Sequence, residues 1–426
     1  MITLAQIREN KATLVDRYQK RMTDINFEGK LTEILDLDAQ RRSTQQIMDD
    51  ELAEANQIAK QIGQLFREGK QAEAGKMKDR AAELKQSSGA LKESLQKIED
   101  QQKEILFHLP NVPQARVPKG NDDTQNELTE EFGSKHRFDF EPKPHWELAD
   151  EYGLIDFEVG VKISGAGFPV YKGKGAKLQR ALINFFLDEA EKAGYQEVIP
   201  PHLVNEASGI GTGQLPDKDA QMYHVGEDGL YLIPTAEVPV TNIYRDLIIK
   251  EDQFPIKNCA YSPCFRREAG SYGKDVRGLN RLHQFDKVEI VRIEKPEHSD
   301  EALEEMKSHV KHLLNKLGLQ SRILLLCGGD LGFAAAVTYD FEVYSAAQER
   351  WLEVSSVSNF ESFQANRLKL RYKNTDGKST LAHTLNGSAL ALPRIMAALL
   401  ENYQQAEHID IPEALKPYLN FEKIEK

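Results

Sequence analysis

Two runs of regularly spaced residues in the first quarter of the chain constrain its fold more than any other feature. From Met77 to Leu109 the seam positions step by four and three residues, and a matching register with polar breaks runs from Leu37 to Leu65. A mean spacing of 3.5 residues keeps one stripe of a helix facing a partner helix. Gly69 lies between the runs and can end the first helix before the second begins. The spacing predicts an antiparallel coiled-coil hairpin, roughly 45–50 Å long at the helical rise per residue.

The pattern alone does not decide what this hairpin does. It fits a coiled coil used for dimerisation as well as it fits an arm that binds nucleic acid. Residues 37–105 hold 12 Lys/Arg against 13 Asp/Glu. The net charge of the segment therefore indicates no simple electrostatic arm for nucleic acid.

The sequence changes character after residue 109. Pro110, Pro113 and Pro118 close the helical region, and β-rich segments with interspersed helices follow. Strands are expected over residues 230–240, 260–268, 283–294 and 350–359, and helices over 175–194 and 299–318. The strands do not alternate regularly with helices as βαβ units do. We expect an α+β chain, with a helical arm over residues 1–111 and a mostly antiparallel β-sheet flanked by helices over residues 112–426.

Composition narrows the class of protein. A hydrophobic fraction of 40% describes a globular chain, and a net charge of −12 argues against non-specific nucleic-acid binding. No apolar run approaches 18 residues, and Arg8 and Glu9 interrupt the place where a signal peptide needs an apolar core. Cys259, Cys264 and Cys327 form neither a disulfide framework nor a spaced metal site. We expect a cytoplasmic protein with no membrane span and with buried, reduced cysteines.

One stretch concentrates charge in this acidic chain. Residues 265–290 hold six Arg/Lys and four Asp/Glu, with a glycine-rich segment in the middle that is expected to be a long loop. If the flanking strands pair, Arg266 shares a face with Glu268, and Phe285 shares a face with Glu289. A guanidinium can neutralise an α-phosphate, an aromatic ring can stack on adenine, and a carboxylate can hold an ammonium group. The set fits an acyl-adenylate site, although residue types alone favour ordinary cross-strand ion pairs slightly more.

Several common phosphate-binding and catalytic motifs are absent from the sequence. The sequence contains no P-loop, no dinucleotide-binding glycine motif, no G-x-S-x-G elbow and no H-E-x-x-H helix, so a nucleotide would be held by side chains on a sheet. Arg394 falls on the first turn of an amphipathic helix, after a polar turn expected at residues 386–388. An arginine at a helix start interacts unfavourably with the helix dipole, which indicates that Arg394 serves a ligand.

Pro200 and Pro201 disfavour a central strand position, so we expect residues 194–204 to lie at an edge or an interface.

The order of the motifs resembles that of class II aminoacyl-tRNA synthetases, and in particular of the bacterial-type seryl-tRNA synthetases. The class signatures are "EVIPPHLV", "FRREAG…RLHQFDKVE" and "ALALPRIMAALLENYQ". The serine-specific markers, which are tighter, are "KPHWEL", "PTAEVPV", "EVSSVSN" and "HTLNGSALA". The resemblance covers essentially the whole chain. It implies that residues 112–426 form a class II catalytic domain.

The resemblance implies a two-step reaction and a set of site residues. Serine and ATP would form seryl-adenylate and pyrophosphate, and the seryl group would pass to the 3′ end of tRNA(Ser), or of tRNA(Sec) where it exists. Arg266 and Arg394 would be catalytic, on the α- and γ-phosphates. The implied ATP-binding residues are Arg266, Arg267, Glu268, Phe285, Glu353, Val354, Ser355, Ser356 and Arg394. The implied serine-binding residues are Thr235, Ala236, Glu237, Glu289, Asn386 and Ser388. Glu353 and Ser356 would hold Mg²⁺ with ATP, and no zinc is expected.

The resemblance also gives the arm a partner. In this family the arm reaches the long variable arm of the tRNA, typically across a homodimer, which favours the RNA-binding interpretation. Two other functions remain to be compared: an amino-acid:carrier-protein ligase, which lacks the long arm, and a non-catalytic RNA-binding paralogue, which would not need the intact motif residues. Val357, Ser362 and Asn366 stand where the family usually has Cys, Asp and Arg. These departures leave details of sheet packing and of the tRNA acceptor contact open.

Overall fold

The computed structural model describes residues 1–217, 220–268 and 277–426. Residues 269–276, which fall in the loop expected between two strands, lie outside the described residues. The chain divides into two compact units. The arm comprises Ile2–Tyr18 and Asp24–Pro110, and the sheet unit comprises Met1, Gln19–Thr23 and Asn111–Lys426. This clustering differs from the sequence-based division in assigning Gln19–Thr23 to the sheet unit.

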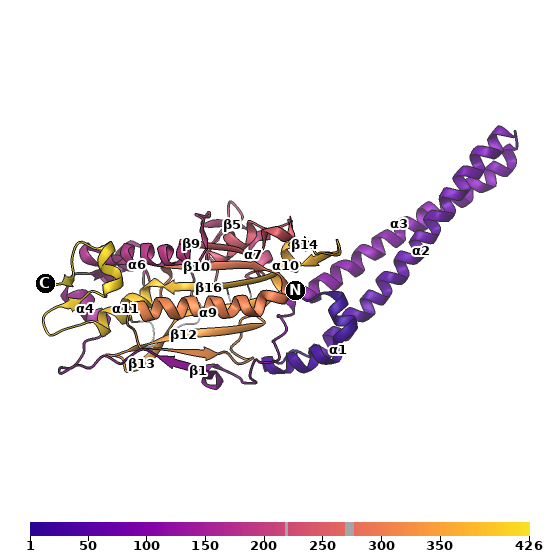
Figure 1. The fold of residues 1–426 in the computed structure, drawn as a ribbon. Coiled ribbons are helices and arrows are strands. Elements are labelled where there is room, and N and C mark those ends of the chain that lie inside the picture. The colour runs from indigo at the N-terminus through magenta and orange to yellow at the C-terminus, as the bar shows by residue number, and fades with distance from the viewer. Residues whose placement is uncertain (218–219, 269–276) are drawn as a thin grey trace. The chain divides into compact units, whose positions relative to one another are not determined.

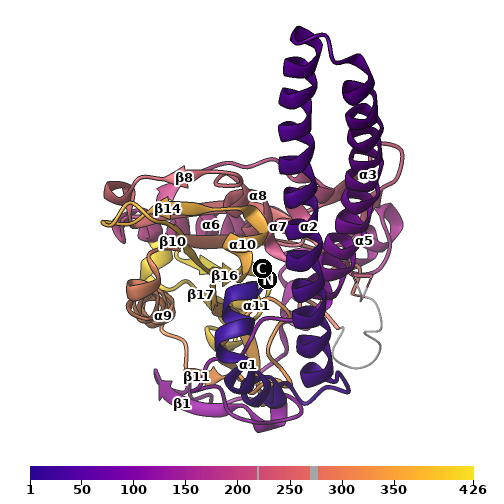
Figure 2. The same ribbon diagram turned by 90° about the vertical axis from the view of Figure 1, so that its right-hand side faces the viewer.

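The arm consists of α1 (Leu4–Tyr18), α2 (Phe27–Arg67) and α3 (Gln71–His108). Helices α2 and α3 lie side by side along their length in both views (Figures 1 and 2). Gly69 has a φ of +76° in the turn between them, where a residue with a Cβ would be strained. The predicted coiled-coil hairpin is thereby confirmed.

The helices of the arm are held together by a narrow apolar seam between α2 and α3 and by a few buried polar contacts, one of which joins α1 to α2. Ile58 and Leu84 are buried on the seam, and the Gln102 amide donates to the Ile34 carbonyl over 3.2 Å. Asp38 is fully buried and accepts bidentate hydrogen bonds of 2.8 Å from Arg8 of α1. Burial opposes ionisation of Asp38, but the hydrogen bonds and charge of Arg8 outweigh it and lower the pKa of the carboxyl.

The sheet unit is built on a mostly antiparallel sheet, as predicted. Within the described ranges this sheet has eight strands, of which only the terminal pair, β4 and β9, is parallel. In spatial order the strands are β1 (Glu127–Phe132), β11 (Ser321–Leu325), β12 (Val337–Ser345), β13 (Arg350–Glu361), β16 (His383–Ala391), β10 (Gln284–Glu294), β9 (Ile256–Phe265) and β4 (Gln196–Glu197). The position of β4 confirms the expectation that residues 194–204 contain an edge segment.

The helices α6 (Gly173–Lys192), α9 (Ser299–Lys316) and α11 (Leu392–Asn402) pack on this sheet (Figure 1). Strand β10 shows how the two faces of the sheet differ. Val288 and Ile290 are fully buried in the main hydrophobic core with these helices, whereas Lys287 and Glu289 line a cavity. The alternation along one strand thus separates the core from the candidate site.

The remaining elements surround this framework. Smaller sheets are formed by β15 (Ser379–Leu381), β14 (Arg371–Lys373) and β8 (Ile248–Ile249); by β5 (Leu203–Asn205), β7 (Leu230–Leu232) and β6 (His224–Val225); by β2 (Ile155–Asp156) and β3 (Val170–Tyr171); and by β17 (Ile409–Asp410) and β18 (Lys423–Ile424). Short helices are α4 (His145–Glu151), α5 (Phe157–Ile163), α7 (Glu206–Thr212), α8 (Glu237–Asn242) and α10 (Phe363–Leu368).

Three local expectations were wrong. Residues 386–388 lie inside strand β16 and do not form a turn, because pairing with β10 and β13 overrides their turn chemistry. Only residues 230–232 of the expected 230–240 strand are extended, and α8 begins at Glu237. Strand β9 ends at Phe265, and Glu268 has a φ of +48°. The pairing of β9 with β10 is nevertheless confirmed, with Phe285 opposite Cys264.

Two other expectations concern cysteines and membrane spans. The three cysteines are free and buried, as expected. Among the described residues, no helix combines the length and the apolar character that crossing a bilayer requires.

A buried bracket fixes the loop over residues 331–335 of the sheet unit. The Arg21 guanidinium donates to the carbonyls of Leu331, Gly332 and Ala335 over 2.7–3.0 Å, and to the carbonyl of Asn111 over 3.0 Å. The Asn111 side chain in turn donates to the Ala334 carbonyl over 2.9 Å. Both side chains are about 4% exposed. Two residues that lie close in sequence to boundaries between the units therefore hold a loop that forms a wall of the cavity described next.

Candidate active site

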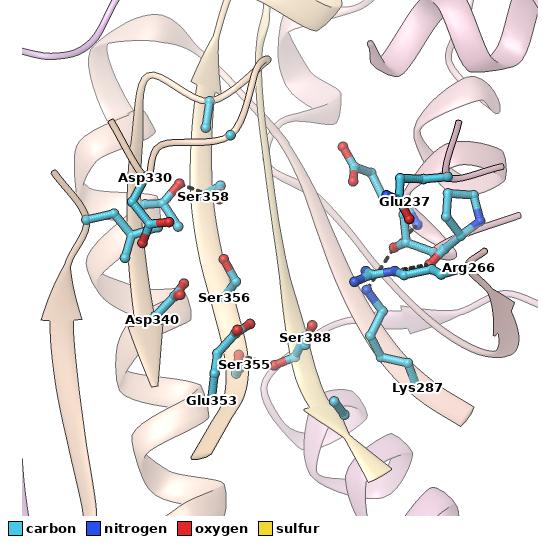
Figure 3. A pocket seen from close by; sticks show the side chains of 18 of the residues that line it. Glu237, Arg266, Lys287, Asp330, Asp340, Glu353, Ser355, Ser356, Ser358 and Ser388 are labelled. Atoms are coloured by element: carbon cyan, nitrogen blue, oxygen red, sulfur yellow. Dashed lines mark hydrogen bonds between the residues drawn. The ribbon is translucent and has the colours of Figure 1, made fainter. Parts of the chain in front are cut away.

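A cavity of about 1290 Å³ lies on the sheet face away from the main core. It is lined by residues of β10, β11, β12, β13 and β16, and by segments before and after these strands. Figure 3 shows Asp330, Asp340 and Glu353 on one side of the strand bearing Ser388, and Arg266 and Lys287 on the other. The floor thus divides into an acidic side and a side that carries cations.

Most of the residues predicted for the site line this one cavity. They are Thr235, Glu237, Arg266, Glu268, Phe285, Glu289, Glu353, Val354, Ser355, Ser356, Asn386, Ser388 and Arg394. Ala236 and Arg267 are not among the lining residues. Ala236 is fully buried in a cluster with Val240 and Ala260, and the Arg267 N–H donates to the Gln221 carbonyl over 2.8 Å.

Arg266 and Phe285 form one corner of the cavity. The Arg266 guanidinium lies 5.2 Å from the centre of the Phe285 ring, and its Nε donates to the Pro234 carbonyl over 3.4 Å. Glu268 pairs with Arg281 at 3.1 Å. Since the Arg266 contacts are to a ring and a carbonyl, its charge is not neutralised by a carboxylate in these contacts. This corner can take an anion and a flat aromatic ligand.

A triangle of buried polar side chains, Thr235, Lys287 and Glu289, occupies the floor next to this corner. Lys287 Nζ lies 2.5 Å from Glu289 Oε2 and donates to Thr235 Oγ1 over 2.9 Å. Thr235 Oγ1 also lies 3.3 Å from Glu289 Oε2. The Lys287 and Glu289 side chains are 8% and 2% exposed, so this ion pair is shielded from solvent.

Glu237 adds a second buried carboxylate to the same side. It accepts a hydrogen bond from the Gln364 amide over 2.6 Å, and its backbone N–H donates to Thr235 Oγ1. Burial, together with the charge of Glu289, raises the pKa of Glu237 to about 7. Glu237 and Glu289 are two carboxylates with only Lys287, among the described residues, as a cation between them, so binding of a further cation beside them is favourable.

The acidic side of the cavity is carried by the β12–β13 pair. Asp340 lies opposite Ser356, and Glu342 opposite Glu353. Burial, followed by the charge of Glu353, raises the pKa of Asp340 well above its usual range, and one of its oxygens is buried without a hydrogen-bond partner among the described residues. The described residues contain no group of three or more His, Cys, Asp or Glu arranged to hold a metal ion.

Arg394 connects the acidic side to the wall of the cavity. It lies on the first turn of α11 after Pro393, as predicted. Its Nη1 donates to the Glu353 carbonyl over 2.6 Å and lies 3.3 Å from the Glu353 carboxylate. Its Nε donates to the Asn280 carbonyl over 3.2 Å. The Arg394 side chain is 28% exposed, so it can bind an anionic ligand beside the acidic strands.

A buried histidine supports the wall that carries Asn280. His145 accepts from the Leu279 N–H over 2.9 Å, so its other nitrogen carries the proton that is donated to Glu401 over 2.8 Å. Glu401 lies near the end of α11, the helix that begins with Arg394. His145 of "KPHWEL" therefore ties the segment around residue 279 to the helix of Arg394.

Sequence reasoning missed Lys287, Asp340 and Asn280. Lys287 has a signal, since it alternates with Phe285 and Glu289 on one face of a predicted strand. Asp340 lies in no motif used above, and its importance depends on pairing with β13. Val357, one of the three departures, is fully buried in the core and lies opposite Tyr339, so a small apolar residue is accommodated there.

Comparisons with known proteins agree with this geometry. The profile of the seryl-tRNA synthetase N-terminal domain matches residues 1–113, and that of the tRNA synthetase class II core domain (G, H, P, S and T) matches residues 222–403. A serine–tRNA ligase of Salinibacter ruber is 54% identical over 92% of both chains, and one of Solibacter usitatus is 45% identical over 100% of this chain and 99% of its own. The crystal structure of seryl-tRNA synthetase from Pyrococcus horikoshii complexed with ATP superposes with a TM-score of 0.93 at 32% identity, covering 100% of this chain and 99% of that one.

Proposed function

Because the chain belongs to the seryl-tRNA synthetase family, we propose that its cavity binds ATP and L-serine side by side and joins them as seryl-adenylate. The chain is a serine–tRNA ligase, an ATP-dependent enzyme with a class II core. The observation that carries the proposal for the site is the division of one cavity floor. Two buried carboxylates, Glu237 and Glu289, lie next to the Arg266–Phe285 corner, so a cation and a nucleotide can be held within one cavity.

In the activation step, the serine carboxylate attacks the α-phosphorus of ATP and pyrophosphate leaves. The carboxylate is already nucleophilic, so positioning and charge stabilisation carry the step and no general base is needed. Arg266 would neutralise the charge that builds on the α-phosphate, and Phe285 would stack on adenine. Arg394 would bind the γ-phosphate, and the predicted roles of Arg267, Glu268, Val354 and Ser355 at ATP are part of the same proposal.

The serine subsite would use its buried polar groups for selection. Glu237, Glu289 and Thr235 would receive the ammonium group, and Asn386 and Ser388 would lie near the side-chain hydroxyl, with Ala236 behind them. Alanine and glycine would leave buried polar groups without partners, which is a strong penalty. Threonine would be excluded by lack of space, which is a weaker filter.

Mg²⁺ is proposed to bind with ATP on the acidic side. The oxygen donors of Glu353 and Ser356 suit this ion, and the buried oxygen of Asp340 beside Ser356 adds to the set. The absence of a larger protein-only cluster among the described residues fits an ion that takes its other ligands from phosphates and water. When bound, Mg²⁺ would neutralise charge on the ATP phosphates.

In the transfer step, the terminal ribose hydroxyl of the tRNA attacks the seryl carbonyl and AMP leaves. We propose that the α2–α3 arm binds tRNA(Ser), and tRNA(Sec) where it exists, through a few placed Lys/Arg and the shape of the RNA. We further propose a cytoplasmic homodimer. The two other functions are not favoured, because serine–tRNA ligases match the chain over its full length, including the arm.

Serine-dependent ATP–pyrophosphate exchange with Mg²⁺ tests the proposal. Exchange is expected to be fastest with L-serine, slower with threonine and slowest with alanine and glycine, assayed side by side on the same preparation. No exchange with serine in the pure wild-type protein would refute the proposed chemistry. Equal exchange with alanine would refute the assignment of the serine subsite while leaving adenylate formation intact.

A further inference from the structure

The carboxylate expected to receive the substrate's ammonium group already holds an ammonium group. Lys287 Nζ lies 2.5 Å from Glu289 Oε2 and 2.9 Å from Thr235 Oγ1, both of which are proposed serine ligands. A second ammonium cannot occupy the same position. Serine binding therefore requires either a different pose or a rearrangement of Lys287.

We propose that Lys287 is a placeholder cation, which occupies the ammonium position in the empty site and moves onto the carboxylate of the amino-acid substrate when serine binds. This inference rests on the proposed function, because it takes L-serine as the ligand of this floor. It adds a substrate-contacting residue to the reaction and a reason why the site selects zwitterions.

The burial of Lys287 limits where its charge can go when serine binds. The Lys287 side chain is 8% exposed, so a lysine displaced from Glu289 stays in a buried environment. A buried cation without a partner is strongly unfavourable. An α-amino acid brings a carboxylate one carbon away from its ammonium group. The substrate ammonium can replace Lys287 on Glu289 while the substrate carboxylate pairs with Lys287, and every charge keeps a partner.

No neighbouring group in the described contacts offers Lys287 an equivalent new partner. Glu237, the other buried carboxylate of the floor, accepts from Gln364 and is proposed to share the substrate's ammonium group. Arg266, the other cation, contacts the Phe285 ring and the Pro234 carbonyl, and it is proposed to serve the α-phosphate. The substrate carboxylate is thus the anion that best completes the exchange. It is also held close to the position where it must attack.

A specificity consequence follows from this exchange. Ethanolamine has the ammonium group and the hydroxyl of serine but lacks the carboxylate. It can displace Lys287 from Glu289, but it leaves the displaced lysine without a partner. The wild-type site should bind L-serine about 100-fold more tightly than ethanolamine, because charged hydrogen bonds are worth about tenfold to more than 100-fold each.

The test is isothermal titration of the full chain with L-serine and with ethanolamine, comparing wild type with Lys287→Met. The variant should bind L-serine about 10- to 100-fold more weakly. It should bind ethanolamine as well as the wild type does, or more tightly, because the competing cation is gone. Lys257→Met is the matched control, since Lys257 lies on the neighbouring strand and pairs with Glu305 at 3.3 Å outside the cavity. This control should change neither ligand.

Other outcomes overturn the inference. If Lys287→Met binds both ligands equally more weakly than wild type, Lys287 only positions Glu289. If neither affinity changes, Lys287 has no role in binding. ATP binding by Lys287→Met reports whether the variant is folded. If it is not, the wild-type comparison decides, because equal affinities for L-serine and ethanolamine contradict the placeholder role. A wild type that carries out serine-dependent exchange but fails this comparison refutes the inference and leaves the proposed function standing.

Discussion

Ion pairs between a cation and a carboxylate occur in both units, but they differ in their exposure to solvent. On the arm, Arg80 and Glu54 lie 3.0 Å apart with side chains about half exposed. On the cavity floor, Lys287 and Glu289 lie 2.5 Å apart with side chains 8% and 2% exposed. A solvated pair contributes little and can be replaced, whereas a buried pair is expensive to break from one side. The charge content of a segment therefore says little about function until its burial is known.

The largest expected effect comes from shortening the arm. Residues 43–94 are replaced by a short Gly/Ser turn, which keeps the Arg8–Asp38 contact and the Gln102–Ile34 hydrogen bond at the base. Aminoacylation of tRNA(Ser) should fall by about 100-fold or more, as expected when several phosphate contacts are lost. Serine-dependent pyrophosphate exchange should stay near the wild-type rate. Full charging by the shortened chain would show that the arm does not read the tRNA.

The second prediction concerns the cation of the cavity corner. Arg266→Ala should slow serine-dependent exchange by about 10²–10³-fold, the typical loss for one preorganised group on a developing negative charge. Arg277→Ala is the control, because Arg277 contacts the Trp146 ring and does not line the cavity. A normal exchange rate for Arg266→Ala would mean that Arg266 is only a structural cation.

The third prediction concerns Arg21, which belongs to the sheet unit although its neighbours in sequence form the arm. Arg21→Ala should destabilise the sheet unit by about 3–5 kcal/mol, because it leaves buried carbonyls of the 331–335 loop without donors. Both tryptophans of the chain, Trp146 and Trp351, lie in the sheet unit, so their fluorescence follows its unfolding in denaturant. Arg8→Ala, whose partner Asp38 lies in the arm, should leave that fluorescence transition in place. An unchanged midpoint for Arg21→Ala would contradict the bracket.

The smallest expected effect concerns stability against pH. The pKa of Glu237 is about 7 when folded and 4.5 ordinarily, so the folded state binds the proton more tightly. Stability should therefore fall as pH rises from about 4.5 to 7, and the full penalty applies above 7. Glu237→Gln should be more stable than wild type by about 2–3 kcal/mol at pH 8 and little different near pH 4.5. The same variant should lose serine binding. Chemical denaturation at the two pH values, with serine titration, checks both parts.

How much the sequence predicts differs between the units. The arm follows from periodicity, because its packing is a repeated local contact between two helices. Gly69 and the prolines after Leu109 also end helices where local chemistry says they should. The assignment of Gln19–Thr23 to the sheet unit could not be predicted, because three of the four carbonyl partners of Arg21 lie more than 300 residues away.

In the sheet unit, alternation predicted that Phe285 and Glu289 share a face, and both line the cavity. Local rules failed where tertiary pairing decides the structure. Residues 386–388 have turn chemistry but form a central strand. Lys287 and Asp340 carry charge and would ordinarily be expected at the surface. Their burial follows from which strands meet, and that information is spread over the whole domain.

The Arg21 bracket also affects the order in which parts of the protein can fold during synthesis. The guanidinium is synthesised 310 residues before the Leu331 carbonyl that it binds. At typical rates of chain elongation, this interval corresponds to roughly 15–60 seconds. The helices of the arm can form within that time from local contacts alone. The 331–335 loop can bind Arg21 only after most of the chain has been synthesised. The arm can thus fold early in synthesis, whereas the wall of the cavity is completed late.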